Sequence, residues 1–242
     1  MSTIRQCKKF GSVLVISSLL LAAGCSTSGE TGGDTGRESG GQEAAAPATS
    51  AVPYPQLLEG ITYKGVPITV APPEEVEETI ENIREWGPEG YQIQLDPPEC
   101  EALYGSDGLE FNFEKLSPET STVGTAETDN FSVRVYNKDA YLNPEAKKLP
   151  QDDPKLAKAC QDYSITSEYG AMDVHVEALP FQGNTDRGYA HTQMSQSDGM
   201  ESASFYTAAW KNDAYVTLSH TAVDPESIDA GFETLNMILD RL

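Results

Sequence analysis

The chain has 242 residues, of which 16 are Lys or Arg and 38 are Asp or Glu, giving a formal charge of −22 at pH 7. Nucleic acid and the anionic surface of a bilayer would both repel this charge, so we expect no nucleic-acid partner. Attachment to a membrane would then have to be covalent, through lipid chains.

The first 25 residues carry the pattern of a lipoprotein signal. Three basic residues lie within the first nine positions, an apolar run covers 13–23, and Ala-Ala-Gly leads up to Cys25. A basic segment, a short apolar segment and a small-residue cleavage site make a secretory signal. An apolar run of about 11 residues is too short to span a bilayer, which takes roughly 20.

Ala-Ala-Gly-Cys resembles a bacterial lipobox, although Ala22 stands where leucine is commonest. It predicts a signal peptide over 1–24, a diacylglycerol thioether on Cys25 and a location at the extracytoplasmic face of the cell membrane. The alternative is an ordinary secretory signal with an incidental cysteine. Cleavage would leave 13 basic and 38 acidic residues, a formal charge of −25.

Residues 25–53 predict the lipidated cysteine followed by a disordered linker. The segment is rich in Gly, Ser, Thr and Ala and contains no aromatic residue, so it cannot bury enough surface to offset its ordering entropy. A coil of this length has an end-to-end distance of about 30 Å. The rest of the chain, 54–242, is long enough to form one sizeable core and is predicted to be a single domain.

Two cysteines remain for the folded domain. Cys7 belongs to the signal and Cys25 is the lipid site, which leaves Cys100 and Cys160. In a secreted chain such a pair predicts a disulfide, and closing so long a loop would contribute about 4 kcal/mol in the chain-entropy model. Two free thiols or a metal-binding pair are the alternatives.

Sequence periodicity predicts the elements in chain order. The first half gives a weak strand over 61–70, a helix over 72–86, a strand over 91–95, a short helix over 96–105, a strand over 109–113 and a strand over 131–136. The second half gives a helix over 153–160, strands over 172–178, 187–193, 202–210 and 215–219, a turn at 211–213 and a helix over 224–242. Asp96, Asp153 and Asp224 are expected to cap their helices. This order predicts an α+β fold with a central antiparallel sheet, helices packed on it and one disulfide.

Few residues point to chemistry. Asp173, His175 and Glu177 share one face of a predicted strand, where they could bind a divalent ion for a metal-assisted envelope hydrolase or simply form the solvated face. Lone His191 and His220 are expected at the surface or hydrogen-bonded. The aromatic set, which could line a pocket or pack a hairpin core, is Phe205, Tyr206, Trp210 and Tyr215. No nucleophile motif with a downstream histidine occurs, so we expect neither an enzyme nor a cofactor.

Three stretches in order resemble a known family. Pro-Pro-Glu-Cys-Glu-Ala-Leu-Tyr at 97–104, Ala-Lys-Ala-Cys-Gln-Asp-Tyr at 157–163 and Trp-Lys-Asn-Asp-Ala-Tyr-Val-Thr-Leu at 210–218 are similar to the PknH-like extracellular sensor domain. This domain occurs on actinobacterial receptor serine/threonine kinases and on actinobacterial cell-surface lipoproteins. The resemblance covers roughly 56–242.

The resemblance implies a central antiparallel sheet with helices around a cleft, and a role in binding or sensing without catalysis. The partner would be an unknown small molecule or envelope component. One departure is that the family's sensor domains carry a second disulfide in the late hairpin region, whereas this chain has no cysteine between 161 and 242. A lipid-carrying lipoprotein with a large apolar cavity is a third possibility.

Overall fold

The computed structural model describes residues 53–86, 94–104, 112, 114–140, 149–167, 170–197 and 199–242. The predicted signal, the lipid site at Cys25 and the linker as far as residue 52 lie outside the described residues. Of the predicted strand 109–113 only Asn112 is described, and it is not in a strand.

One antiparallel sheet of nine strands organises the domain, in the order β3-β5-β6-β11-β10-β9-β8-β7-β4. Its strands are β3 (Thr69–Val70), β4 (Gln94–Asp96), β5 (Ser121–Ala126), β6 (Phe131–Asn137), β7 (Asp162–Ser167), β8 (Gly170–Leu179), β9 (Arg187–Ser197), β10 (Met200–Lys211) and β11 (Ala214–His220). A separate small hairpin consists of β1 (Thr62–Tyr63) and β2 (Val66–Pro67). The predicted α+β class with a central antiparallel sheet is confirmed.

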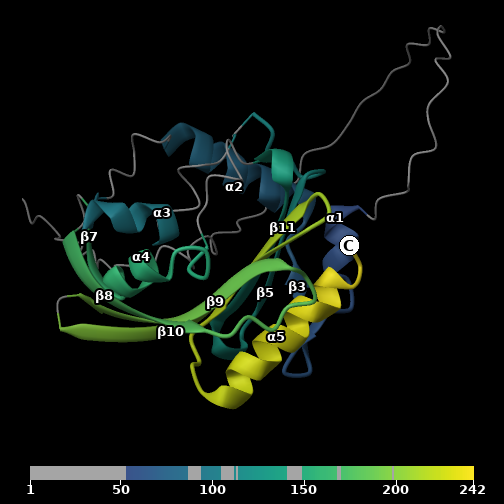
Figure 1. Ribbon diagram of the computed structural model, residues 1–242. Helices are drawn as coiled ribbons and strands as arrows, with labels where there is room; N and C mark the ends of the chain where they lie inside the picture. The colour runs from purple at the N-terminus through teal and green to yellow at the C-terminus, as the bar shows by residue number, and fades with distance from the viewer. Residues whose placement is uncertain are drawn as a thin grey trace, which may run out of the picture.

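Helices cover both sides of the sheet (Figure 1). They are α1 (Tyr54–Leu58), α2 (Pro73–Trp86), α3 (Glu101–Tyr104), α4 (Pro154–Ala159) and α5 (Pro225–Leu239), with 3-10 turns η1 (Pro98–Cys100), η3 (Thr128–Asn130) and η4 (Lys138–Ala140). Helices α2, α3 and α4 lie on one side, here called the α2 face. Helices α1 and α5 lie on the other, here called the α5 face.

The C-terminal helix α5 builds the main core on the α5 face. Its N-cap is Asp224, whose side chain accepts a hydrogen bond from the backbone N–H of Ser227 at 3.0 Å, as predicted. Its apolar residues Phe232, Leu235 and Leu239 are buried. They belong to one cluster with alternating residues of β6 and β11, namely Phe131, Val133, Val135, Val216 and Leu218.

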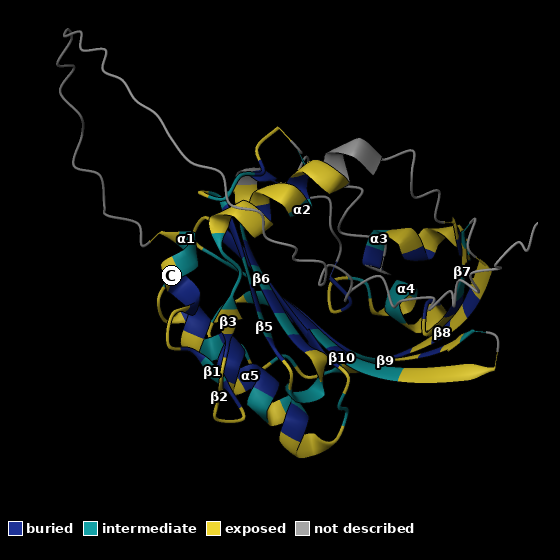
Figure 2. Ribbon diagram, turned by 180° about the vertical axis from the view of Figure 1, so that it is seen from behind, coloured by how far each residue is buried: buried dark blue, intermediate teal, exposed yellow. Residues whose placement is uncertain are grey.

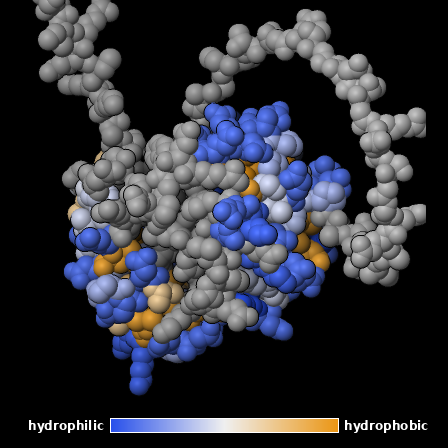
Figure 3. Space-filling model, turned by 90° about the horizontal axis from the view of Figure 1, so that it is seen from above, coloured by the Kyte–Doolittle hydropathy of each residue, from blue (hydrophilic) through white to orange (hydrophobic). Residues whose placement is uncertain are grey.

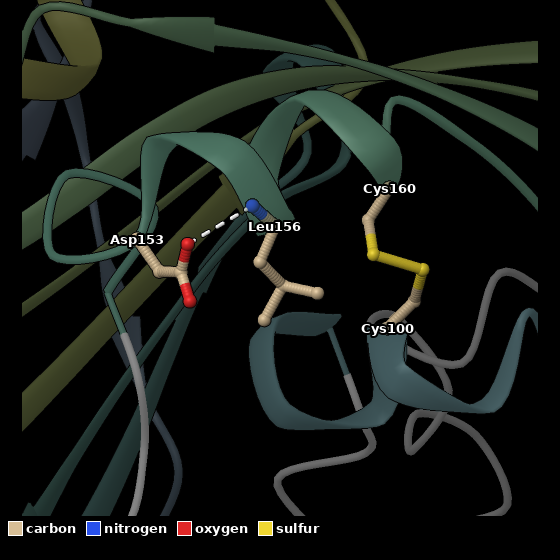
Figure 4. The surroundings of a disulfide bond; sticks show 4 residues. All are labelled: Cys100, Asp153, Leu156 and Cys160. Carbon is tan, nitrogen blue, oxygen red and sulfur yellow. Dashed lines mark hydrogen bonds between the residues drawn. A yellow bond between two sulfur atoms is a disulfide. The ribbon is translucent and has the colours of Figure 1, made fainter.

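The disulfide ties two short helical segments onto the α2 face. Cys100 at the end of η1 and Cys160 at the C-cap of α4 are bonded, with Cα atoms 5.5 Å apart, and both are fully buried. Figure 4 shows the bond beside Leu156, whose backbone N–H donates to the N-cap Asp153 at 3.0 Å. The predicted disulfide and the predicted Asp153 cap are both confirmed, and the pair therefore holds neither free thiols nor a metal.

Two sequence-based expectations were wrong in detail. The segment 61–70 is not one strand, because Lys64 (φ 49°) and Gly65 (φ 75°) make a left-handed turn between β1 and β2. Asp96 is not a helix cap: it ends β4 and pairs with Ser164 of β7, while η1 starts after Pro97 without a side-chain cap.

Two strands, β5 and β7, were not predicted at all. The β5 sequence Ser-Thr-Val-Gly-Thr-Ala is small and polar and lacks the alternation of large apolar residues that marks a strand. Its residues are nevertheless mostly buried, because the strand lies between β3 and β6.

The surface of the described part is largely hydrophilic where Figure 3 shows it, with small separate apolar areas. Within that part of the chain, no helix is both long and apolar enough to cross a bilayer.

Candidate functional site

Helix α5 covers only part of its face of the sheet, and the rest is open to solvent. On β10, Phe205 is buried under α5, whereas Glu201, four residues earlier on the same face, is exposed. Figure 2 shows the exposed stretch of β7 to β10 extending beyond α5. We call this region the open face; it consists of Asp96, Asp162, Ser164, Asp173, His175, Glu177, Met194, Gln196, Glu201 and Ala203.

Strand register arranges the open face in two rows of directly opposed residues. The first row is Asp96, Ser164, Asp173, Gln196 and Glu201. The second row is Asp162, His175, Met194 and Ala203. Most of both rows line an open depression of about 350 Å³. Because directly opposed residues project to the same side of a sheet, each row presents its side chains together to solvent.

His175 is the best-positioned reactive side chain of the open face. Its Nδ1 lies 2.7 Å from Oδ1 of Asp162 on the neighbouring strand, which leaves Nε2 as the ring nitrogen available for another contact. Its opposite neighbour on β9 is Met194, which is 45% exposed. A thioether can bind a ligand, but it cannot act as the nucleophile that a His–Asp pair activates in acyl transfer.

The structure places the three candidate residues Asp173, His175 and Glu177 on one exposed face, as the strand alternation predicts. Asp173, His175 and Glu177 alternate with the buried residues of β8. At about 3.3 Å per residue, neighbours on this face are about 6.6 Å apart, too far for three of them to share one ion. Among the described residues, no group of three or more His, Cys, Asp or Glu side chains could hold a metal ion. Asp162 and Met194 were not singled out from the sequence, because only strand register brings them beside His175.

The predicted aromatic set divides between the two faces. Phe205 lies on the α5 face and packs edge-on against Phe232, with ring centroids 5.4 Å apart. Trp210 and Tyr215 lie on the α2 face with centroids 4.4 Å apart, and the guanidinium carbon of Arg187 lies 4.7 Å from the Trp210 ring. Phe205 and Tyr215 are fully buried, so the hairpin-core interpretation holds for them.

We expected His191 and His220 to lie at the surface or to be hydrogen-bonded. Both are buried, and the expectation is wrong for His220. His191 is 5% exposed and stacks on Tyr206, with centroids 5.3 Å apart. His220 is 1% exposed, and neither of its ring nitrogens has a hydrogen-bond partner within the described residues. Burial lowers the pKa of His220 to about 4, and the negative charge of Asp129 acts in the opposite direction without restoring the ordinary value.

A polar cluster connects the β1–β2 hairpin to the start of α5. Lys64 Nζ donates to Asp129 Oδ2 and to Ser227 Oγ, each at 2.7 Å, and Tyr63 Oη donates to the same Asp129 oxygen at 2.9 Å. The hydrogen bond from Lys64 lowers the pKa of Asp129, and burial raises the pKa of Tyr63.

A depression of about 670 Å³ lies beside this cluster, lined by Lys64, Glu226, Asp229, Ala230 and Glu233. Its cation is already bonded to Asp129 and Ser227, and its other charged side chains are acidic. We therefore interpret the cluster as a structural connection, and the open face as the candidate site.

Comparisons with known proteins give only weak similarity. No protein-family model and no curated protein matches the sequence. The extracellular domain of PknH from Mycobacterium tuberculosis is similar in structure with a TM-score of 0.38 and 10% identity, over 72% of this chain and 97% of that one. An Rv0999 ortholog from Mycobacterium smegmatis is similar with a TM-score of 0.37 and 13% identity, over 72% of this chain and 85% of that one.

Proposed function

We propose that the chain is a lipid-anchored protein of the extracytoplasmic face of the cell membrane, whose domain binds a ligand or envelope partner without catalysis. The observation that carries the compartment is the buried Cys100–Cys160 disulfide, because such bonds form and persist in oxidising compartments. The lipobox-like sequence ending at Cys25 and the linker over 25–53 supply an anchor and a tether for the same arrangement.

The chemistry of the open face supports a binding role without catalysis. Its His175–Asp162 pair has the polarity of a general base and its orienting carboxylate, but the residue across from His175 is Met194. The depression itself is lined by carboxylates, amides, hydroxyls and one thioether, which can hold a polar or cationic ligand. A lipid carrier would need an apolar cavity, whereas the depression of the open face and the one beside Lys64 are lined mainly by charged and polar residues.

Mass analysis of the N-terminal peptide tests the anchor. The full chain, expressed in a bacterium that processes lipoproteins, should begin at Cys25, carry a diacylglyceryl group there and fractionate with membranes. Cys25→Ala should carry no lipid, and the processed, membrane-bound form of the chain should no longer be found. Cys7→Ala is the matched control, because Cys7 lies within the removed signal and its loss should change neither mass nor fractionation. An unmodified Cys25 in the wild-type chain would contradict the anchor.

A thermal-shift panel tests binding. Envelope glycans, lipids and peptides are added to the purified full chain, and a ligand that prefers the folded state must raise the melting temperature. A substitution that fills the depression, Gln196→Trp, should reduce the shift, whereas Glu233→Ala, outside the open face, should not. A panel that leaves the melting temperature unmoved would argue against the binding role.

A further inference from the structure

We propose that the open face holds a single soft metal ion, Cu(I) or its analogue Ag(I), between Nε2 of His175 and the thioether sulfur of Met194. This inference deepens the proposed function and rests on it, because it names the class of ligand that the binding face would take.

The first support is the position of the two donor groups. His175 on β8 and Met194 on β9 are directly opposed in the antiparallel register and line the same depression. The Cβ atoms of such pairs lie about 4.5–5.5 Å apart. Zinc sites have metal–nitrogen bonds of about 2.0 Å and metal–sulfur bonds of about 2.3 Å, and an ion with bonds of similar length would need the two donor atoms within about 4.3 Å of one another. Methionine has three rotatable side-chain bonds, so its sulfur can reach such a position.

The second support is the hydrogen bond that orients the imidazole. Asp162 Oδ1 lies 2.7 Å from Nδ1 of His175. A metal-ligating histidine commonly donates its other ring N–H to a carboxylate, which fixes the tautomer and makes the ligating nitrogen more basic. With Nδ1–H directed to Asp162, the lone pair of Nε2 is available for an ion.

The third support is the identity of the exposed apolar residue. Met194 is 45% exposed, and the residues directly opposite it are His175 on β8 and Ala203 on β10, so its sulfur lies outside the hydrophobic core and beside the imidazole. A thioether beside an imidazole selects soft ions such as Cu(I) over Mg²⁺, Ca²⁺ or Mn²⁺.

The acidic residues of the open face attract cations but do not themselves form a site for a hard metal ion. Asp96, Asp173 and Glu201 alternate with Ser164 and Gln196 along the first row, so the carboxylates are separated from one another. In the part of the chain that the structure describes, no three His, Cys, Asp or Glu side chains form a cage that would hold a hard ion. The combined negative field of the carboxylates on the open face still raises the local concentration of cations.

Titration calorimetry with Ag(I) in chloride-free buffer tests the assignment. The protein is the full chain in detergent with Cys7→Ser and Cys25→Ser, so that no free thiol competes, and with the disulfide verified by mass. We expect one ion per chain. Met194→Leu and His175→Gln should each weaken binding by tenfold or more. Asp162→Asn should weaken it by about tenfold, the lower end of the effect of an orienting partner.

Met237→Leu is the matched control, because Met237 is 38% exposed on α5 away from the depression and receives the same substitution. Its affinity should equal that of the parent chain. Anaerobic competition with a Cu(I)-specific chromophoric chelator should give the same order of variants. NMR supplies a second readout, since Ag(I) should shift the Met194 methyl and the His175 ring signals while leaving Met237 unmoved.

Equal affinity in Met194→Leu and Met237→Leu would overturn the proposal, and so would the absence of Ag(I) and Cu(I) binding. Zn²⁺ binding that is tighter than Ag(I) binding and unchanged by Met194→Leu would also overturn the proposal, because it would indicate a site built from oxygen and nitrogen ligands. None of these results would decide the proposed function, which is tested separately by the N-terminal mass analysis and the thermal-shift panel.

Discussion

The imidazole of His220 stacks on the ring of Phe205, with centroids 4.8 Å apart and planes 28° from parallel. The Tyr63 ring also lies beside the imidazole, with centroids 5.2 Å apart, and α5 passes over the imidazole at Gly231. The histidine ending β11 is therefore a neutral aromatic residue of the core, joining the sheet, the β1–β2 hairpin and α5.

Burial of His220 predicts that the domain loses stability as the pH falls. The pKa of His220 is lowered to about 4 in the folded chain, against about 6.5 when unfolded. The contribution of neutral His220 to the free energy of unfolding is complete above pH 6.5. It is lost as the pH falls toward 4, because in that range only the unfolded chain takes up the proton. The loss amounts to about 3 kcal/mol.

Urea unfolding of wild type and His220→Phe at pH 7.5 and pH 4.5 measures this effect. Phenylalanine keeps the stack but cannot be protonated, so its variant should lose clearly less stability on acidification. The carboxylates of Asp129 and Asp224 remain in both chains, so the comparison isolates His220 together with its charge interactions with these two groups. His175→Gln, at an exposed histidine, should behave as wild type. Parallel pH dependence in wild type and His220→Phe would count against the prediction.

Gly231→Ala should destabilise the domain, although alanine normally favours a helix. A Cβ at this position would lie 2.9 Å from both Nε2 of His220 and Cε1 of Phe205. The two rings belong to a packed core, so we expect a cost of about 1–3 kcal/mol, as for overpacked cores. Thermal unfolding checks it, with Glu233→Ala on the exposed side of the same helix expected to have little effect. A stabilised Gly231→Ala chain would show that the helix can move away freely.

Asp129→Asn should weaken the connection between the β1–β2 hairpin and α5. One oxygen of Asp129 accepts from both Tyr63 and Lys64, and its backbone has φ 57°, which asparagine tolerates. Loss of charge-assisted hydrogen bonds at this half-buried site should cost about 1–2 kcal/mol. The matched control is Asp213→Asn, because the Lys138–Asp213 pair is largely exposed and should contribute nothing measurable. Equal unfolding midpoints for the two variants would refute this role.

Removing the disulfide should destabilise the part of the domain that contains α3 and α4. The bond joins residues 60 apart in sequence, and the chain-entropy model assigns about 4 kcal/mol to such a loop. Cys100→Ala/Cys160→Ala should unfold at a lower urea concentration than the oxidised wild type. Reduced wild type should behave like the double variant and be heavier than the oxidised chain by two hydrogens. A reductant that leaves the unfolding midpoint unchanged would contradict the prediction.

Local pattern was enough for much of the fold. The strands β6, β8, β9, β10 and β11 and the helices α2, α4 and α5 follow from alternation, helical spacing and the caps Asp153 and Asp224. The pairing of Cys100 with Cys160 follows from counting, because the predicted signal and lipid site account for the other two cysteines. Strands β5 and β7 were missed because their sequences are short and largely polar, and they become strands through their neighbours in the sheet.

The candidate site depended on tertiary structure. The sequence by itself determined that Asp173, His175 and Glu177 share one exposed face, since alternation along a strand is a local property. It did not determine that Asp162 and Met194 flank His175, or that His220 lies under α5. Those neighbours come from other strands and a distant helix. Strand register and helix placement select them through the packing of the whole core, which no local pattern encodes.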